Sequence, residues 1–128
     1  MILPCEVAVK SVVPAVKALL AKKLVEEQGL KQGQVAEILG ISQSAVSKYS
    51  RNIRGYAVKL DSIEDIYPLL NEMAALVMRR TFKRACFVEL FCEACMAIRK
   101  EKVMCSLCQR SDSTINIQQC GFCFRSEP

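Results

Sequence analysis

Cysteine is concentrated in the C-terminal part of the chain, at a spacing that suits metal ligation. Six thiols form three C-x-x-C pairs, which read CEAC, CSLC and CGFC: Cys92, Cys95, Cys105, Cys108, Cys120 and Cys123. Two intervening residues allow both sulfurs of a pair to face one metal ion, on a helical turn or in a tight loop. One such pair would be weak evidence, whereas three pairs in a short segment predict a metal centre.

The spacing leaves the kind of metal open. The chain has no histidine, so the ligands would all be thiolates, which suits Zn²⁺ in a four-cysteine site or an iron–sulfur (4Fe–4S) cluster. The gaps of nine and eleven residues between the pairs are shorter than those of common zinc modules. The C-x-x-C-x-x-C run of many ferredoxins is absent too. The apolar sequence around CEAC slightly favours a cluster shielded from solvent.

Several ligand sets are compatible with this spacing. The four thiols closest together in the sequence are the first choice: Cys92, Cys95, Cys105 and Cys108. Cys120 and Cys123 would replace one pair or serve a second centre, with Cys5 or Cys86 as an additional ligand. Cys5 and Cys86 are equally compatible with small buried apolar residues. A thiol–disulfide switch without metal and inert buried cysteines are the alternatives for the whole group.

Positive charge is concentrated in the first half of the chain. The formal net charge is +5. Residues 1–60 hold nine basic and four acidic side chains, whereas residues 61–128 hold nine of each. A half that contacts nucleic-acid phosphates requires such an excess.

Residues 32–51, QGQVAEILGISQSAVSKYSR, predict two short helices joined by a tight turn at Gly40 and Ile41. Ser42 is placed to cap the second helix through its hydroxyl. Each helix has an apolar face, made by Val35, Ile38 and Leu39 in the first helix and by Ala45, Val46 and Tyr49 in the second. This arrangement is a helix-turn-helix.

Polar side chains remain on the outer face of the second helix. They are of the kind that reaches base edges and phosphates in a major groove: Gln43, Ser44, Ser47 and Lys48. Gln32, Arg51 and Arg54 are predicted to hold the DNA backbone. The alternative for the two arginines is that they are ordinary solvated cations.

Further helices are expected on both sides of this unit. The first ten residues are expected to be irregular. Ser11 is predicted to cap a helix over residues 12–27, and Gly29 to end it in a left-handed conformation. This helix would complete a trihelical core.

A second helical region is expected after the helix-turn-helix. The capping box at Asp61–Glu64 predicts a helix that begins near Ser62, with a kink or a new start at Pro68. Helical sequence continues to Lys100, with a gap near Thr81. Its apolar stripe is expected to form a homodimer, because one trihelical head contacts few base pairs. The alternative is that the stripe packs on the chain's own core.

The segment LKQGQVAEILGISQSAVSKY resembles the helix-turn-helix of the lambda-repressor-like (Xre) class of DNA-binding proteins. More narrowly, PCEVAVKSVVPAVKALLAKKLVEEQGL, this motif and RNIRG together resemble predicted archaeal transcriptional regulators that carry a cysteine-bearing C-terminal region. The resemblance implies sequence-specific DNA binding in an archaeal cytosol. The chain departs from the commoner motif at Asn52 and Ile53, where a small-Gly-Lys turn is more usual.

Other function classes lack their sequence signals. No uncharged apolar run approaches the length of a membrane span, and Glu6 and Lys10 interrupt the start of the chain. We therefore expect a cytoplasmic protein without a membrane partner, in which disulfides are disfavoured. The sequence shows no phosphate-cradling glycine loop and no nucleophile and base pair, so neither an enzyme nor a small-molecule substrate is expected.

These patterns predict an all-α protein in three parts. A helix-turn-helix domain spans residues 1–60, a helical linker and dimerisation arm spans 61–85, and a small cysteine-rich metal-binding module spans 86–128. The predicted function is sequence-specific binding of double-stranded DNA by a homodimeric transcriptional regulator. Its metal centre would organise the C-terminal module and, as an iron–sulfur cluster, sense redox state or iron. The alternative is a protein-interaction adaptor with structural zinc and no DNA affinity.

Overall fold

The computed structural model describes residues 2–50, 64–79, 82–116, 118–121 and 123. All regular elements in these residues are helices, which confirms the predicted all-α class. There are seven of them: α1 (Pro4–Lys10), α2 (Val12–Glu26), α3 (Gln32–Leu39), α4 (Gln43–Ser50), α5 (Ile66–Val77), α6 (Arg84–Lys100) and α7 (Cys105–Ser111). No helix in the described residues is both long and apolar enough to cross a membrane.

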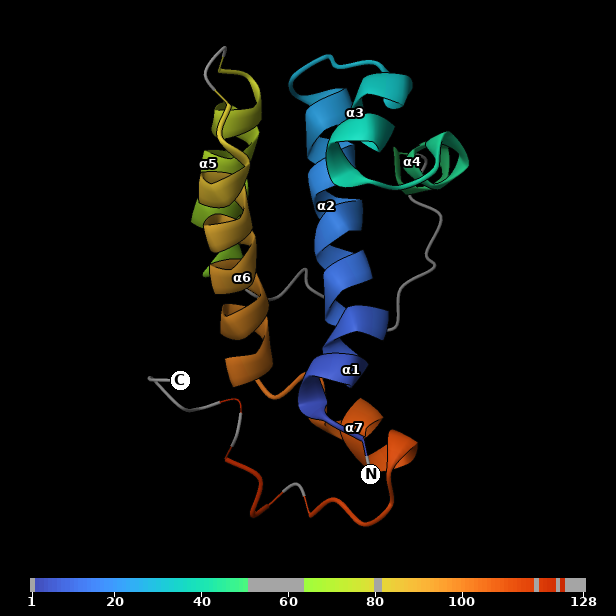
Figure 1. Cartoon of the computed structure of the whole chain (residues 1–128), viewed down its shortest axis with the longest axis vertical. Helices are drawn as coiled ribbons and strands as arrows, with labels where there is room; N and C mark the ends of the chain where they lie inside the picture. The colour runs from blue at the N-terminus through green and yellow to red at the C-terminus, as the bar shows by residue number, and fades with distance from the viewer. Residues whose placement is uncertain (1, 51–63, 80–81, 117, 122, 124–128) are drawn as a thin grey trace.

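The long helix α2 lies at the centre of the molecule (Figure 1). It contacts α3 and α4 on one side and the α5–α6 pair on the other. Three of its small residues, Ala15, Ala18 and Ala21, are almost completely buried, as are Leu20 and Leu24. A helix that is apolar around most of its circumference is expected to be covered on several sides.

The start of the chain is a helix, which corrects the irregular segment expected for the first ten residues. Pro4 opens α1, where its missing N–H removes no hydrogen bond. The carboxylate of Glu6 accepts a hydrogen bond from the Leu3 N–H at 2.9 Å. Ser11 stands at the N-cap position of α2, as predicted, but its side chain does not cap that helix: the buried hydroxyl donates to the Val7 carbonyl of α1 at 2.6 Å.

Other predicted helix ends agree with the structure. Gly29 adopts a φ of 69°, which confirms the left-handed end of α2. The start predicted near Ser62 lies outside the described residues. Pro68 lies in the first turn of α5, so the structure has the new start rather than the kink. The break between α5 and α6 includes the predicted gap near Thr81, although Thr81 itself lies outside the described residues.

Helices α5 and α6 lie side by side, and both contact α2. The apolar side chains of α5 face inward: Ile66, Leu70, Met73 and Ala74 are at most 3% exposed. The stripe thus packs on the chain's own core, as in the alternative prediction, and the homodimer stays a prediction.

One apolar core runs through the described residues, from Val7 in α1 to Cys108 and Cys123 near the C-terminal end. Helix α7 contacts α1, and the Ile2 N–H donates to the Asp112 carboxylate at 3.2 Å. The two ends of the described chain therefore meet at one pole of the molecule (Figure 1). The predicted division into three parts stays a prediction.

Candidate functional site

The turn between α3 and α4 follows the local sequence signals. Gly40 ends α3 with φ 66° and ψ 37°, a left-handed conformation that L side chains rarely adopt. The Ile41 N–H donates back to the Ala36 carbonyl at 3.1 Å. The Ala45 N–H donates to the Ser42 hydroxyl at 3.1 Å, which confirms Ser42 as the cap of α4.

Burial of the two helices fixes which of their faces remain accessible. Val35, Leu39 and Val46 are at most 6% exposed and form the contact between α3, α4 and α2. The inward position predicted for Ile38 is wrong, because this side chain is 36% exposed. Ala36 is buried in its place, since α3 is rotated so that Ile38 lines a groove on another side of the molecule.

The outer face of α4 and the start of α3 form a shallow concave surface, named the α4 surface below. It is lined by five of the predicted DNA-contacting residues: Gln32, Gln43, Ser44, Ser47 and Lys48. The lining includes one cation and no carboxylate, and its other side chains are uncharged donors and acceptors. Such a surface suits a polyanion that offers both phosphates and base edges. Arg51 and Arg54 lie outside the described residues.

The second chemical feature is a small cavity at the opposite end of the molecule. Two C-x-x-C pairs contribute to its walls, together with Arg99 and Met104; the four thiols are Cys105, Cys108, Cys120 and Cys123. Cys108 and Cys123 are buried, and the other two are half-buried. The four sulfurs do not close on one point: no group of three or more cysteine or carboxylate side chains in the described residues is arranged to hold a metal ion.

The first C-x-x-C pair lies elsewhere. Cys92 and Cys95 are one helical turn apart on α6; Cys92 is exposed and lines the groove that also contains Ile38. Burial, and next the neighbouring Cys92 thiolate, raise the pKa of Cys95 to about 11. The structure therefore does not bring the first-choice set of four together. Cys86 is exposed on α6.

The thiols of the cavity influence one another electrostatically. Burial raises the pKa of Cys105 and Cys108, and repulsion from a Cys123 thiolate raises both further. Ionised Cys120 acts in the same direction on both. A cation held among these sulfurs would turn this repulsion into attraction, and for that reason metal binding to thiols releases protons.

Sequence reasoning missed Arg99, which lies four residues after Cys95 on α6. Its side chain is 6% exposed, and its Nε donates to Cys123 Sγ at 3.3 Å. Its Nη1 lies 3.5 Å from Met96 Sδ and 4.0 Å from Cys5 Sγ. Burial alone would lower the pKa of Arg99, but the contacts with Cys123 and Cys5 outweigh it and raise the pKa above its usual value. The signal available in the sequence was one arginine among apolar residues in FCEACMAIRK.

Comparison with known proteins identifies one part of the chain. A family model described as helix-turn-helix matches residues 22–55, which include α3 and α4. The match supports the helix-turn-helix that the sequence predicted in this part of the chain. The match covers well under half of the chain. No curated protein and no solved structure matches.

Proposed function

We propose that this protein is a transcriptional regulator that recognises specific DNA sequences by placing α4 in the major groove. The observation that carries the proposal is the α4 surface, where five polar or basic side chains gather on the exposed side of a helix-turn-helix. The excess of positive charge in residues 1–60 supports it. Helix-turn-helix proteins read bases with the N-terminal residues of their second helix.

The side chains of the α4 surface divide into two roles. The Gln43 amide offers a donor and an acceptor, the combination that pairs with adenine in the major groove. Lys48 would contact a phosphate or guanine. Gln32 opens α3, and the first N–H groups of a helix lack intrahelical acceptors and suit a phosphate. Contacts to phosphate fix the register of the protein on the duplex, and contacts to base edges select the sequence.

Selection of bound duplexes from a random pool, followed by titration at several salt concentrations, tests the proposal. We expect an enriched motif and an affinity that falls steeply with salt. Lys48→Ala should weaken binding about tenfold, whereas Lys10→Ala, on α1, should not. An adaptor protein would show no affinity to weaken, and the absence of salt-dependent binding would reject DNA recognition.

We also propose that Cys105, Cys108, Cys120 and Cys123 bind one metal ion. They line one cavity, and Arg99 donates to one of them. A thiolate that binds metal is commonly stabilised by such a second hydrogen bond. Four thiolates around Zn²⁺ carry a net charge of −2, which the buried guanidinium would partly balance. Binding requires rotation of the side chains, because the sulfurs do not yet converge.

The size of the cavity favours a single ion over a cluster. Its volume is about 20 Å³, roughly the space of one water molecule, so a cluster of four irons and four sulfides would require a larger movement of the cavity walls than one ion would. The proposed centre is therefore structural Zn²⁺, which would hold residues 120–123 against α7. The sequence alone had slightly favoured iron and a redox-sensing role.

Metal analysis of protein purified without oxygen tests this centre. We expect about one zinc per chain and a colourless solution. Cys105→Ser with Cys108→Ser should release the metal, whereas Cys92→Ser with Cys95→Ser should keep it. A brown protein with sulfur-to-iron absorption, or loss of metal in the second variant only, would contradict the assignment.

A further inference from the structure

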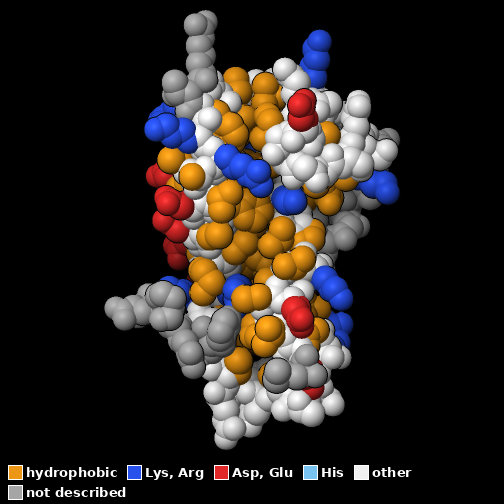
Figure 2. Space-filling view, viewed as in Figure 1, with side chains coloured by type: hydrophobic (Ala, Val, Ile, Leu, Met, Phe, Trp, Pro, Cys, Tyr) orange, Lys and Arg blue, Asp and Glu red, His pale blue; other side chains and the backbone are white. Residues whose placement is uncertain are grey.

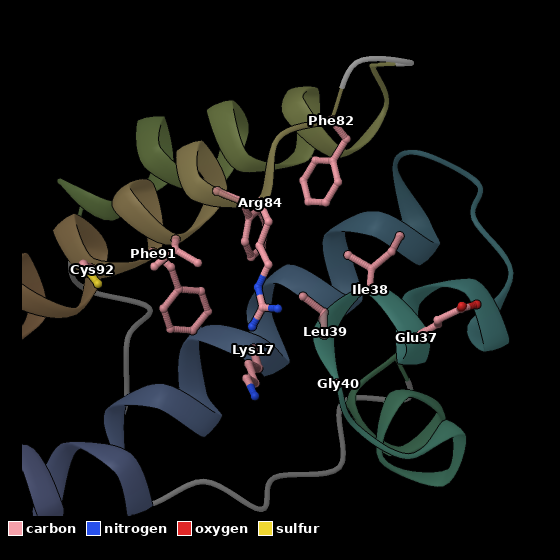
Figure 3. Close-up of a pocket in the computed structure, with 11 residues that line it drawn as sticks. Lys17, Glu37, Ile38, Leu39, Gly40, Phe82, Arg84, Phe91 and Cys92 are labelled. Carbon is pink, nitrogen blue, oxygen red and sulfur yellow. The ribbon is translucent and has the colours of Figure 1, made fainter.

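A groove between the helix-turn-helix and α6 takes no part in the proposed function. Its volume is about 660 Å³, within the range of small-molecule binding sites. Helix α2 forms its floor, residues 37–40 at the end of α3 form one wall, and residues 82–92 form the other (Figure 3). We name it the α3–α6 groove.

The walls of the α3–α6 groove are largely apolar. Three phenylalanines follow one another along one side: Phe82 and Phe87 have ring centroids 5.8 Å apart, and Phe87 and Phe91 6.3 Å apart. Ile38, Phe82 and Val88 are each between 36% and 45% exposed. Figure 2 shows apolar side chains across this face of the molecule, with basic side chains among them. Large apolar side chains that share an exposed hollow suit an apolar partner.

Two cations extend into this apolar hollow. Lys17 from α2 and Arg84 from α6 both line it; the Arg84 guanidinium points toward Lys17, and the Glu37 carboxylate points away from both (Figure 3). Neither cation forms a hydrogen bond or an ion pair with another residue in the part of the chain that the structure describes. Two unpaired cations on the lining of one apolar groove favour an anionic group beside them.

We propose that the α3–α6 groove binds a small amphipathic anion, whose carboxylate or phosphate head lies beside Lys17 and Arg84 and whose apolar body lies against the phenylalanines. A second copy of this chain fits the groove less well. A symmetric contact would bring two Lys17 and two Arg84 side chains together inside an apolar interface, where like charges repel strongly. The inference does not depend on DNA binding.

Calorimetric titration of the full chain with four probes tests the site. Decanoate and decyl phosphate carry both features of the ligand, decanol carries only the apolar body, and acetate carries only the charge. We expect one anion bound per chain, about tenfold more tightly than decanol, because a charge-assisted hydrogen bond adds roughly that factor. The tighter of the two anions identifies the head group. Acetate should bind too weakly to measure.

Variants separate this site from general adsorption. Lys17→Gln and Arg84→Gln should each weaken decanoate binding several-fold and leave decanol binding unchanged. Lys100→Gln, an exposed position at the other end of α6, is the matched control and should bind as the parent does. Equal affinity for decanoate and decanol, or full decanoate binding by the Lys17→Gln, Arg84→Gln double variant, would overturn the proposal. So would sedimentation data in which Val88→Glu converts a dimer to a monomer, because a second copy would then occupy the groove.

Discussion

Arg99 is a buried cation whose hydrogen bonds suit the metal site proposed at the cysteine cavity. A buried guanidinium is costly unless acceptors or anions surround it. Two of the three guanidinium nitrogens of Arg99 meet sulfur atoms: Nε meets Cys123, and Nη1 meets Cys5 and Met96. A thiolate accepts such hydrogen bonds better than a thiol does, so the Cys123 position would gain most from Arg99 if the proposed metal ionised Cys123.

We predict that Arg99→Met lowers the metal affinity of the chain by about 10- to 100-fold, the usual effect of removing a hydrogen bond to a ligating group. Methionine keeps an unbranched apolar stem of similar length, so the helix should persist. Competition with a chromogenic chelator measures the change. Lys100→Met, at the exposed neighbouring position of α6, is the control. Equal metal affinities of the two variants would show that Arg99 does not support metal binding.

Gly40 is the residue on which the geometry of the turn depends. Its φ of 66° costs an alanine roughly 1 kcal/mol or more, although a Cβ there would meet no atom within 4 Å. We therefore predict that Gly40→Ala lowers the free energy of unfolding by about that amount, as measured by urea denaturation. Gly33→Ala, in the first turn of α3 with ordinary φ, should leave it unchanged or slightly raise it. Equal losses in both variants would contradict this explanation.

At the scale of elements, the features that could be predicted from the sequence are the helix ends and caps that neighbouring residues determine. A glycine that ends a helix and a serine that caps the next act within a few residues, so the helix-turn-helix could be placed from its letters alone. The same local signals indicated a kink or a new start at Pro68, and α5 begins two residues before it, at Ile66. The side-chain cap predicted at Ser11 is wrong because the Ser11 hydroxyl donates to α1, a helix that the sequence pattern did not predict.

Contacts between distant segments could not be predicted in this way. Spacing grouped the C-x-x-C pairs by their distance along the chain, whereas the fold brings Cys105 and Cys108 beside Cys120 and Cys123. Helix α6 holds the first pair away from this cavity. The α3–α6 groove has the same origin, since its walls are far apart in the sequence and become neighbours only because both contact α2.

The packing of α5 gives a prediction at this scale. Met73 is fully buried against the core, whereas Met78, just after the same helix, is 47% exposed. We predict that Met73→Ala lowers the free energy of unfolding by about 2–5 kcal/mol, because it leaves a cavity. Met78→Ala should change it by less than about 0.5 kcal/mol. A small loss for Met73→Ala would mean that α5 is not packed on this core in solution.

At the scale of the whole molecule, α2 connects the two chemical features. Its N-terminal end continues from α1, which α7 contacts, and α3 and α4 pack along its length. The Asp112 side chain connects the start of the chain to the segment after α7. Hydrogen bonds from Thr114, and then from the Ile2 N–H, lower the pKa of its carboxyl. Cys108 and Cys123 belong to the same apolar core as Val46 of α4. We therefore expect a change at the cysteine cavity to affect the helix that would read DNA.

If the proposed metal is bound, its removal should loosen more than the cysteine cavity. A ligand bound only by the folded state stabilises every element that unfolds with it. We predict that chelation speeds amide hydrogen exchange at Val46 in α4 as well as at Cys108 in α7, because both lie in one core. The measurement is exchange followed by mass spectrometry, with the Cys105→Ser, Cys108→Ser variant as a reference for the metal-free state. If exchange rises in α7 while α4 keeps its protection, the two ends of the molecule unfold independently and the metal supports only its own surroundings.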